Sequence, residues 1–132
     1  MTATTPSGKP TLLMAEDEED TAGLIRFLLE RAGYHVVHAP DGHQAQQLID
    51  TMPPPNLVLL DIMLPHVSGL QLLPYIRNKT EWQQVPIVML TADSSEHDIQ
   101  QALAAGANDY MVKPFNPREL TARLSRFLKA AA

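Results

Sequence analysis

The chain has 132 residues, of which 45% are hydrophobic and 19% charged, and this is the size and composition of one globular domain. Ten Lys and Arg against fifteen Asp and Glu give a net charge of −5, and without a basic cluster we expect no direct nucleic-acid binding. There is no cysteine, which excludes disulfides, thiolate metal sites and cysteine nucleophiles. The chain has neither an apolar run of the roughly 18 residues that a membrane helix needs nor a signal-peptide core at its start. We therefore expect a soluble, cytoplasmic protein with no membrane contact.

The first ten residues are rich in Thr, Ser, Gly and Pro, which predicts a flexible tail over 1–10 and one folded domain over 11–130. Short apolar runs then alternate with longer segments of helical periodicity. The expected strands cover 12–15, 34–39, 57–60, 87–90 and 110–112. Several of these runs are apolar without interruption, which is typical of parallel strands covered on both faces.

A helical stripe of apolar residues follows each expected strand. The first stripe ends before Gly33, which we expect to terminate the helix, and the third contains Pro74, which should bend that helix or shift its start. The last begins with Asn116 as the N-cap and Pro117 in the first turn. Five strand–helix units in succession predict an α/β fold, with a parallel sheet between two layers of helices.

Polar residues follow four of the five expected strands. Glu16 and Asp17 follow the first, Asp61 the third, Thr91 the fourth and Lys113 the fifth. In open parallel sheets, ligands bind beyond the carboxyl ends of the strands, so these side chains are candidates for one site. Taken singly, Asp17 could be part of a solvated helix turn, Thr91 a helix cap and Lys113 a surface lysine. Their occurrence at four strand ends of one sheet favours a shared function.

The chemistry of this set points to a phosphoryl group. Three neighbouring carboxylates repel one another and need a cation, and their hard oxygen atoms favour Mg²⁺ over zinc. A lysine and a hydroxyl at the same edge suit phosphoryl oxygens, and an aspartate can itself act as the nucleophile. The AEDEED segment lacks the glycines of nucleotide-binding loops, so the phosphoryl group must come from another kind of donor.

Four segments together resemble a known family: LLMAEDEED, LVLLDIMLPHVSG, IVMLTA and GANDYMVKPFNPREL. In this order and spacing they are similar to the receiver domain of two-component response regulators, including the chemotaxis type. The resemblance extends from Thr11 to Lys129. It implies a doubly wound, flavodoxin-like fold, with a five-stranded parallel sheet of order 2-1-3-4-5 flanked by five helices.

The resemblance also implies roles for individual residues. Asp61 corresponds to the phosphoacceptor. Glu16 and Asp17 correspond to the acidic pair, with Asp17 a direct Mg²⁺ ligand, and the backbone carbonyl of Met63 corresponds to a further metal ligand. Glu16 stands where the family often has an aspartate, which keeps the charge.

Other positions are assigned from the same resemblance. Thr91 and Lys113 correspond to the residues that contact the phosphoryl oxygens, and Tyr110 to the aromatic side chain that turns inward on activation. The peptide bond from Lys113 to Pro114 is expected to be cis. Ser68 replaces a frequent aspartate, and we interpret it as a helix cap. Asp93 stands where the family places residues that influence phosphate lifetime.

The function implied is that of a signalling module. A sensor histidine kinase or histidine phosphotransfer protein would phosphorylate Asp61, and the surface of the fourth helix, fifth strand and fifth helix would change its preference for a downstream target, an output domain or a second copy in a dimer. The protein would promote only its own phosphorylation and dephosphorylation. One alternative is a phosphatase of the haloacid dehalogenase type, but Met63 stands where the second aspartate of that family is needed. Another is a protein-binding pseudo-receiver, against which the intact set of site residues argues.

The remaining candidate residues are interpreted structurally. The five histidines show no metal-ligand spacing along a helix, so we expect surface or edge positions for them; they are His35, His38, His43, His66 and His97. His66 lies in the segment after Asp61, where it could touch a partner. Trp82 is expected to pack against the domain.

Overall fold

The structure is a computed structural model and describes residues 8–92 and 96–128. Its strands are β1 (Thr11–Ala15), β2 (His35–Ala39), β3 (Leu57–Asp61), β4 (Ile87–Thr91) and β5 (Asp109–Val112). Its helices are α1 (Glu19–Arg31), α2 (Gly42–Thr51), α3 (Gly69–Arg77), the short 3-10 helix η1 (Thr80–Trp82), α4 (Glu96–Ala104) and α5 (Pro117–Leu128). The predicted alternation of strands and helices is confirmed, with strand ends that differ from the prediction by one residue.

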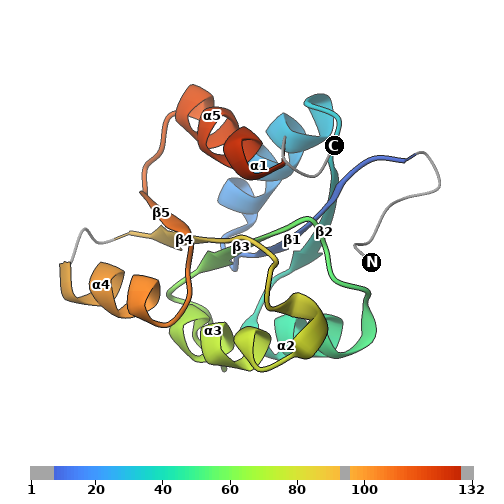
Figure 1. Ribbon diagram of the computed structural model, residues 1–132. Helices are drawn as coiled ribbons and strands as arrows, with labels where there is room; N and C mark the ends of the chain where they lie inside the picture. Colours follow the sequence, from blue (N-terminus) through green and yellow to red (C-terminus); the bar gives the residue numbers. More distant parts are fainter. Residues whose placement is uncertain (1–7, 93–95, 129–132) are drawn as a thin grey trace.

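The five strands form one parallel sheet of order β2-β1-β3-β4-β5. Figure 1 shows α1 and α5 on one face of this sheet and α2, α3 and α4 on the other. The doubly wound arrangement and the strand order implied by the resemblance are therefore confirmed. The order reverses between β1 and β3, and such a reversal is where open α/β sheets bind their ligands.

Alternate side chains of the strands supply the two halves of the core. On β1, Leu12 and Met14 pack with residues of α1 and α5, while Leu13 and Ala15 pack with residues of α2, α3 and α4. All four side chains are completely buried. Because both faces of the sheet are covered, every position of a central strand must be apolar, and this explains the uninterrupted run at 57–60.

The helix ends agree with the predicted caps. Ser68 begins α3 as its N-cap: its side chain accepts a hydrogen bond from the Gln71 N–H at 3.2 Å, and Gln71 Oε1 accepts one from the Ser68 N–H at 3.0 Å. Asn116 Oδ1 accepts a hydrogen bond from the Arg118 N–H at 2.7 Å at the start of α5. Pro74 lies inside α3, on its exposed side, and the helix continues past it to Arg77.

Several other predictions can be compared with the described residues. Trp82 packs into the core with 2% of its surface exposed, as expected. Most of the predicted tail over 1–10 lies outside the described residues, and so does Asp93. The tail and the role assigned to Asp93 therefore remain predictions. Within 8–92 and 96–128, no helix has both the length and the apolar character needed to cross a bilayer.

Candidate functional site

The carboxylates of the candidate site lie where β1 and β3 end side by side. Ala15 of β1 is in register with Leu60 of β3, so Glu16 and Asp61, the next residues on each strand, meet at the carboxyl edge of the sheet. The backbone N–H of Glu16 donates to Ala39 of β2 at 3.0 Å, which fixes where β1 ends. The side chains of Glu16 and Asp61 are both buried.

Lys113, which directly follows the edge strand β5, contacts both of these carboxylates. Its Nζ lies 2.7 Å from Glu16 Oε1 and 2.8 Å from Asp61 Oδ2. The side chains are 0% exposed for Glu16, 4% for Asp61 and 18% for Lys113. Since β5 is separated from β3 by β4, the long lysine side chain crosses the end of β4 to reach both carboxylates.

Backbone groups hold the carboxylates in place. The Met63 N–H donates to Asp61 Oδ1 at 2.9 Å, and the Glu18 N–H donates to Glu16 Oε2 at 3.0 Å. Gly69 passes so close to Asp61 that a Cβ at this glycine would lie 2.3 Å from the Asp61 carbonyl oxygen. Backbone N–H groups of nearby residues thus orient each carboxylate.

The electrostatics of the site reflect burial and pairing. Burial raises the pKa of Glu16, and the hydrogen bonds from Lys113 and the Glu18 N–H oppose this increase without cancelling it. Burial alone would lower the pKa of Lys113, but hydrogen bonds to Asp61 and Glu16 outweigh it, and the pKa is raised. Lys113 is therefore held firmly in its cationic form.

The carboxylates of Glu16, Asp17 and Asp61 fit a hard divalent cation. One ligand atom from each lies within 4.8 Å of the others. Glu16 Oε1 is buried, and its close contact is the ion pair with Lys113. Asp17 is exposed at the rim and gives access from solvent. Carboxylate oxygens suit Mg²⁺, which in proteins usually binds through one or two carboxylates and keeps several water ligands.

Thr91 and Tyr110, the two predicted switch residues, lie on neighbouring strands. Thr91 ends β4, is 2% exposed and is in register with Val112. Tyr110 lies on β5, is half-buried and packs against the core beneath α2, α3 and α4. The Lys113–Pro114 peptide bond is cis, as the resemblance implied.

A groove opens beside Lys113, between α1 and the segment that joins β5 to α5. Its lining includes Leu24 of α1, Pro114 and Phe115, together with Lys113 itself. Leu24 is 44% exposed, and Phe27, one helical turn further along α1, is 55% exposed. The groove therefore places an apolar surface directly next to the charged site.

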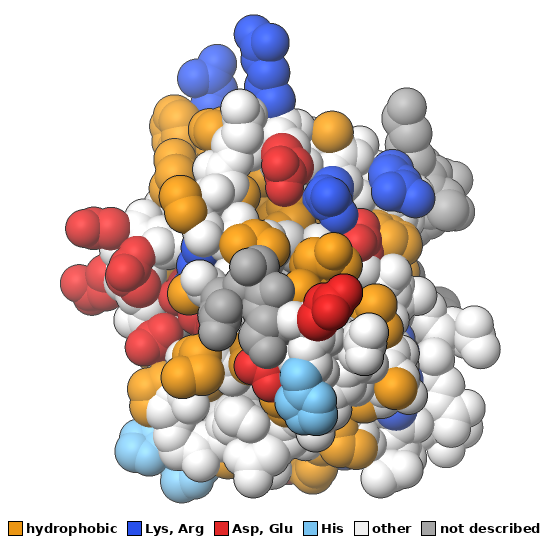
Figure 2. All heavy atoms as spheres, turned by 90° about the vertical axis from the view of Figure 1, so that its left-hand side faces the viewer, with side chains coloured by type: hydrophobic (Ala, Val, Ile, Leu, Met, Phe, Trp, Pro, Cys, Tyr) orange, Lys and Arg blue, Asp and Glu red, His pale blue; other side chains and the backbone are white. Residues whose placement is uncertain are grey.

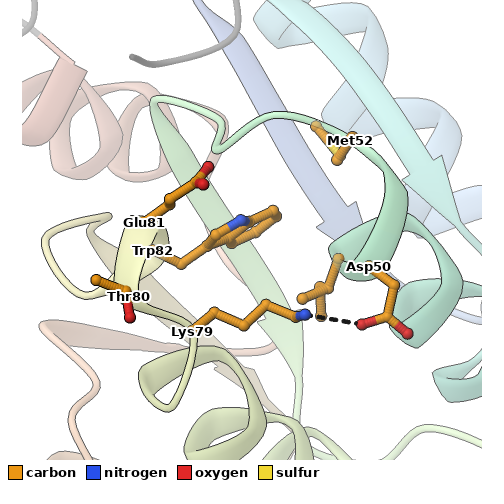
Figure 3. Close-up of a pocket in the computed structure, with 7 residues that line it drawn as sticks. Asp50, Met52, Lys79, Thr80, Glu81 and Trp82 are labelled. Atoms are coloured by element: carbon orange, nitrogen blue, oxygen red, sulfur yellow. Dashed lines mark ion pairs between the residues drawn. The ribbon is translucent and has the colours of Figure 1, made fainter.

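A second hollow lies near the opposite edge of the sheet, where α2 and η1 lead into β3 and β4 (Figure 3). Trp82 lies between Met52 and Lys79 in this view, and Lys79 Nζ makes an ion pair of 2.9 Å with Asp50 Oδ1. None of the predicted site residues lines this hollow. It is separate from the carboxylate site.

Two histidine contacts were not predicted from the sequence. His38 Nε2 lies 2.8 Å from the Glu16 carbonyl oxygen, so this β2 side chain buttresses the acidic pair. The rings of His43 and His66 stack on each other with their centroids 4.9 Å apart. Both contacts join residues from different elements, and no local spacing rule could have identified them.

Comparison with known proteins agrees with this geometry. Residues 12–125 match the family described as "Response regulator receiver domain". The alkaline phosphatase synthesis transcriptional regulatory protein PhoP of Bacillus subtilis is 41% identical over 118 residues, which are 89% of this chain and 48% of PhoP. The chain thus spans about half the length of the curated relatives it matches.

Solved structures of the same family are also similar. The chemotaxis response regulator CheY4 of Vibrio cholerae has a TM-score of 0.85 at 29% identity, over 91% of this chain and 99% of CheY4. The receiver domain of the sensor histidine kinase PA1611 of Pseudomonas aeruginosa, described with a magnesium ion in its active site cleft, has a TM-score of 0.83 at 32% identity, over 92% of this chain and 98% of that one. The fold, the carboxylate–lysine geometry and these matches together show that the chain belongs to the receiver domain family of two-component response regulators.

Proposed function

We propose that Asp61 accepts a phosphoryl group from a phosphohistidine on a sensor histidine kinase or histidine phosphotransfer protein. The observation that carries this proposal is the bridge from Lys113 to both Asp61 and Glu16, which holds a nucleophilic carboxylate beside a fixed positive charge. The carboxylate supplies the nucleophile, and the positive charge neutralises oxygens of the incoming phosphoryl group. The domain that carries this activity would cover residues 11–130, in the cytoplasm.

Each residue of the site has a role in this proposal. Glu16, Asp17, Asp61 and the carbonyl of Met63 would hold Mg²⁺, which when bound neutralises charge on the phosphoryl oxygens. A carboxylate oxygen of Asp61 attacks phosphorus. The new O–P bond forms as the P–N bond to the donor imidazole breaks, and the imidazole leaves with the bonding electron pair and takes up a proton.

The groove beside Lys113 fits the donor of the phosphoryl group. A donor must bring its histidine next to Asp61, and the groove lined by Leu24, Pro114 and Phe115 includes Lys113, which contacts Asp61. We propose that the helix bearing the phosphohistidine lies in this groove. The exposed ring of Phe27 would extend the contact along α1.

The proposed output is a change in the surface formed by α4, β5 and α5. The hydroxyl of Thr91 would contact a phosphoryl oxygen on Asp61, and its movement would make room for the Tyr110 ring to turn inward. The downstream partner would be a target protein, an output domain or a second copy in a phosphorylation-dependent dimer. Apolar side chains are already visible on this side of the molecule (Figure 2), and Leu103 of α4 is 42% exposed.

In this role the protein is a switch and not a turnover enzyme. The protein would promote only its own phosphorylation and dephosphorylation. A phosphatase of the haloacid dehalogenase type would need an acid two residues after the nucleophile. Met63 occupies that position, with 72% of its surface exposed, and its side chain carries no proton to donate.

Acetyl phosphate or phosphoramidate with Mg²⁺ would test the phosphoacceptor. We expect mass spectrometry to show one added phosphate on the wild type and none on Asp61→Asn. Asp50→Asn, at an exposed carboxylate near the other edge of the sheet, is the control and should be phosphorylated normally. A comparable yield of phosphate on Asp61→Asn would overturn the assignment.

A beryllofluoride complex, which mimics the phosphoryl group, would test the switch. We expect amide signals across 106–120 to shift in the wild type, and Thr91→Ala to lose most of that distant response while remaining a substrate for acetyl phosphate. A full response in Thr91→Ala would contradict coupling through Thr91 and Tyr110.

A further inference from the structure

Two exposed histidines from different parts of the chain lie against each other at the start of α2. His43 is the second residue of α2, and His66 lies in the segment between β3 and α3. Their ring centroids are 4.9 Å apart, and the ring planes make an angle of 25°. Both side chains are exposed, so their ring nitrogens can be reached from solvent.

The backbone holds this pair together. The Gly42 N–H donates to the Pro65 carbonyl at 3.0 Å, which ties the first turn of α2 to the segment carrying His66. A Cβ at Gly42 would lie 1.9 Å from the Val67 carbonyl oxygen, so only glycine permits this approach. The backbones that carry the two rings are therefore held close together.

The conformation of His66 adds to this constraint. Its φ of 72° lies in the left-handed region, which non-glycine residues seldom adopt. The turn is closed by a hydrogen bond from the Val67 N–H to the Pro65 carbonyl at 2.9 Å. His66 thus projects from the apex of a tight turn, toward the helix that carries His43.

We propose that His43 and His66 form a binding site for a divalent transition-metal ion such as Ni²⁺, Cu²⁺ or Zn²⁺. Imidazole nitrogen suits these ions, whereas Mg²⁺ prefers oxygen. Metal–nitrogen bonds of about 2.0–2.1 Å bring two coordinating rings close together, and the ring centroids here are 4.9 Å apart. Because imidazole lone pairs lie in the ring plane, the stacked rings would have to turn until one nitrogen of each points at the same ion, and the exposure of both side chains leaves room for this. Water would complete the coordination.

The proposed site differs from the carboxylate site in both place and chemistry. In the part of the chain that the structure describes, the group of three or more ligating side chains within 4.8 Å is Glu16, Asp17 and Asp61, and neither histidine belongs to it. With two protein ligands, the histidine site should bind more weakly than a closed structural site. It should follow the general order in which Cu²⁺ binds more tightly than Ni²⁺.

Calorimetric titration of the whole chain with Ni²⁺, in excess Mg²⁺ to occupy the carboxylates, tests this site. We expect one equivalent to bind to the wild type. His43→Gln and His66→Asn should each weaken binding at least tenfold; asparagine is chosen because it tolerates the left-handed conformation. His35→Gln, which removes an exposed histidine from β2, is the matched control and should bind as the wild type does.

Two further measurements make the result decisive. Circular dichroism would verify that each variant is folded, and paramagnetic broadening by Ni²⁺ should be centred on the amides around His43 and His66. Unchanged affinity in His43→Gln would overturn the proposal, as would loss of binding in Asp61→Asn, because the ion would then lie at the carboxylates. Phosphorylation of Asp61 is measured separately, so failure here leaves the proposed function intact.

Discussion

Replacing Lys113 with alanine should leave two buried carboxylates facing each other without a counterion. Lys113 Nζ lies 2.7 Å from Glu16 Oε1 and 2.8 Å from Asp61 Oδ2, and these two acidic side chains are at most 4% exposed. The substitution removes the charge and the hydrogen bonds but adds no atoms that could clash. Its effect on stability therefore combines the loss of this charge with the loss of packing by the lysine stem, which is 18% exposed.

The magnitude follows from these distances. At an effective dielectric constant of about 20, each contact corresponds to a Coulomb attraction of about 6 kcal/mol. Much of this is offset by the cost of burying the charges, and removing one partner from a buried ion pair typically costs about 3–5 kcal/mol. Protonation of one abandoned carboxylate limits the loss. We expect Lys113→Ala to lower the free energy of unfolding by about 3 kcal/mol at neutral pH in EDTA.

Urea denaturation would measure this loss. The single tryptophan, Trp82, is 2% exposed and provides a fluorescence signal, and circular dichroism provides a second signal. The matched control is Lys79→Ala, because Lys79 lies 2.9 Å from Asp50, almost the same separation, but in an exposed pair. Surface pairs contribute little, so the control should unfold close to the wild-type midpoint.

Magnesium should restore part of the lost stability. A divalent cation held by the same carboxylates replaces the missing positive charge, so Mg²⁺ should stabilise Lys113→Ala more than it stabilises the wild type. If Lys113→Ala unfolds at the wild-type midpoint in EDTA, Lys113 is not the counterion that the geometry indicates. Equal stabilisation of both proteins by Mg²⁺ would show that the ion binds elsewhere.

Three further substitutions test other parts of the structure. Because burial raises the pKa of Glu16, the ionised side chain costs stability above that pKa, and Glu16→Gln should stabilise the protein in EDTA at neutral pH. Urea titrations should show this gain in stability shrinking as the pH falls through the raised pKa toward 4.5. A gain that grows on acidification would contradict the prediction. Arg77 donates hydrogen bonds to four backbone carbonyls, and Arg77→Ala should lower the free energy of unfolding by about 2–3 kcal/mol. An unchanged urea midpoint would contradict this expectation. Gly69→Ala places a Cβ 2.3 Å from the Asp61 carbonyl and should cost about 1–3 kcal/mol in thermal unfolding. Gly23→Ala, where a Cβ meets nothing within 4 Å, is its control and should not destabilise.

Much of the fold could be predicted from the sequence because the three central strands are covered on both faces. Full burial of β1, β3 and β4 leaves little room for polar residues within these strands, so each of these apolar runs and the polar residue that ends it are visible in the sequence. For the same reason, Asp61 after LVLL and Thr91 after IVML could be identified as residues at the carboxyl ends of strands. The strand order was not visible in any local pattern and came from the resemblance to the receiver family.

The contacts that were missed depend on how separate elements meet. His38 reaches the Glu16 carbonyl because β2 pairs with β1 in one particular register, in which His38 lies beside Met14. His43 meets His66 because Gly42 lets α2 approach the segment before α3. A helical spacing rule compares residues within one helix, so it could not find a pair shared between a helix and a turn.

The position of Lys113 explains why a long, flexible cation is needed at this point of the sheet. β1 and β5 are not neighbours, since β3 and β4 lie between them, so a residue following β5 must span the ends of two strands to contact Glu16. The same ammonium also contacts Asp61 at the end of β3. An ammonium can serve two carboxylates from one small point charge, whereas the planar guanidinium of arginine needs a fixed, wider arrangement of acceptors. The sheet order and the chemistry of the site therefore constrain this residue together.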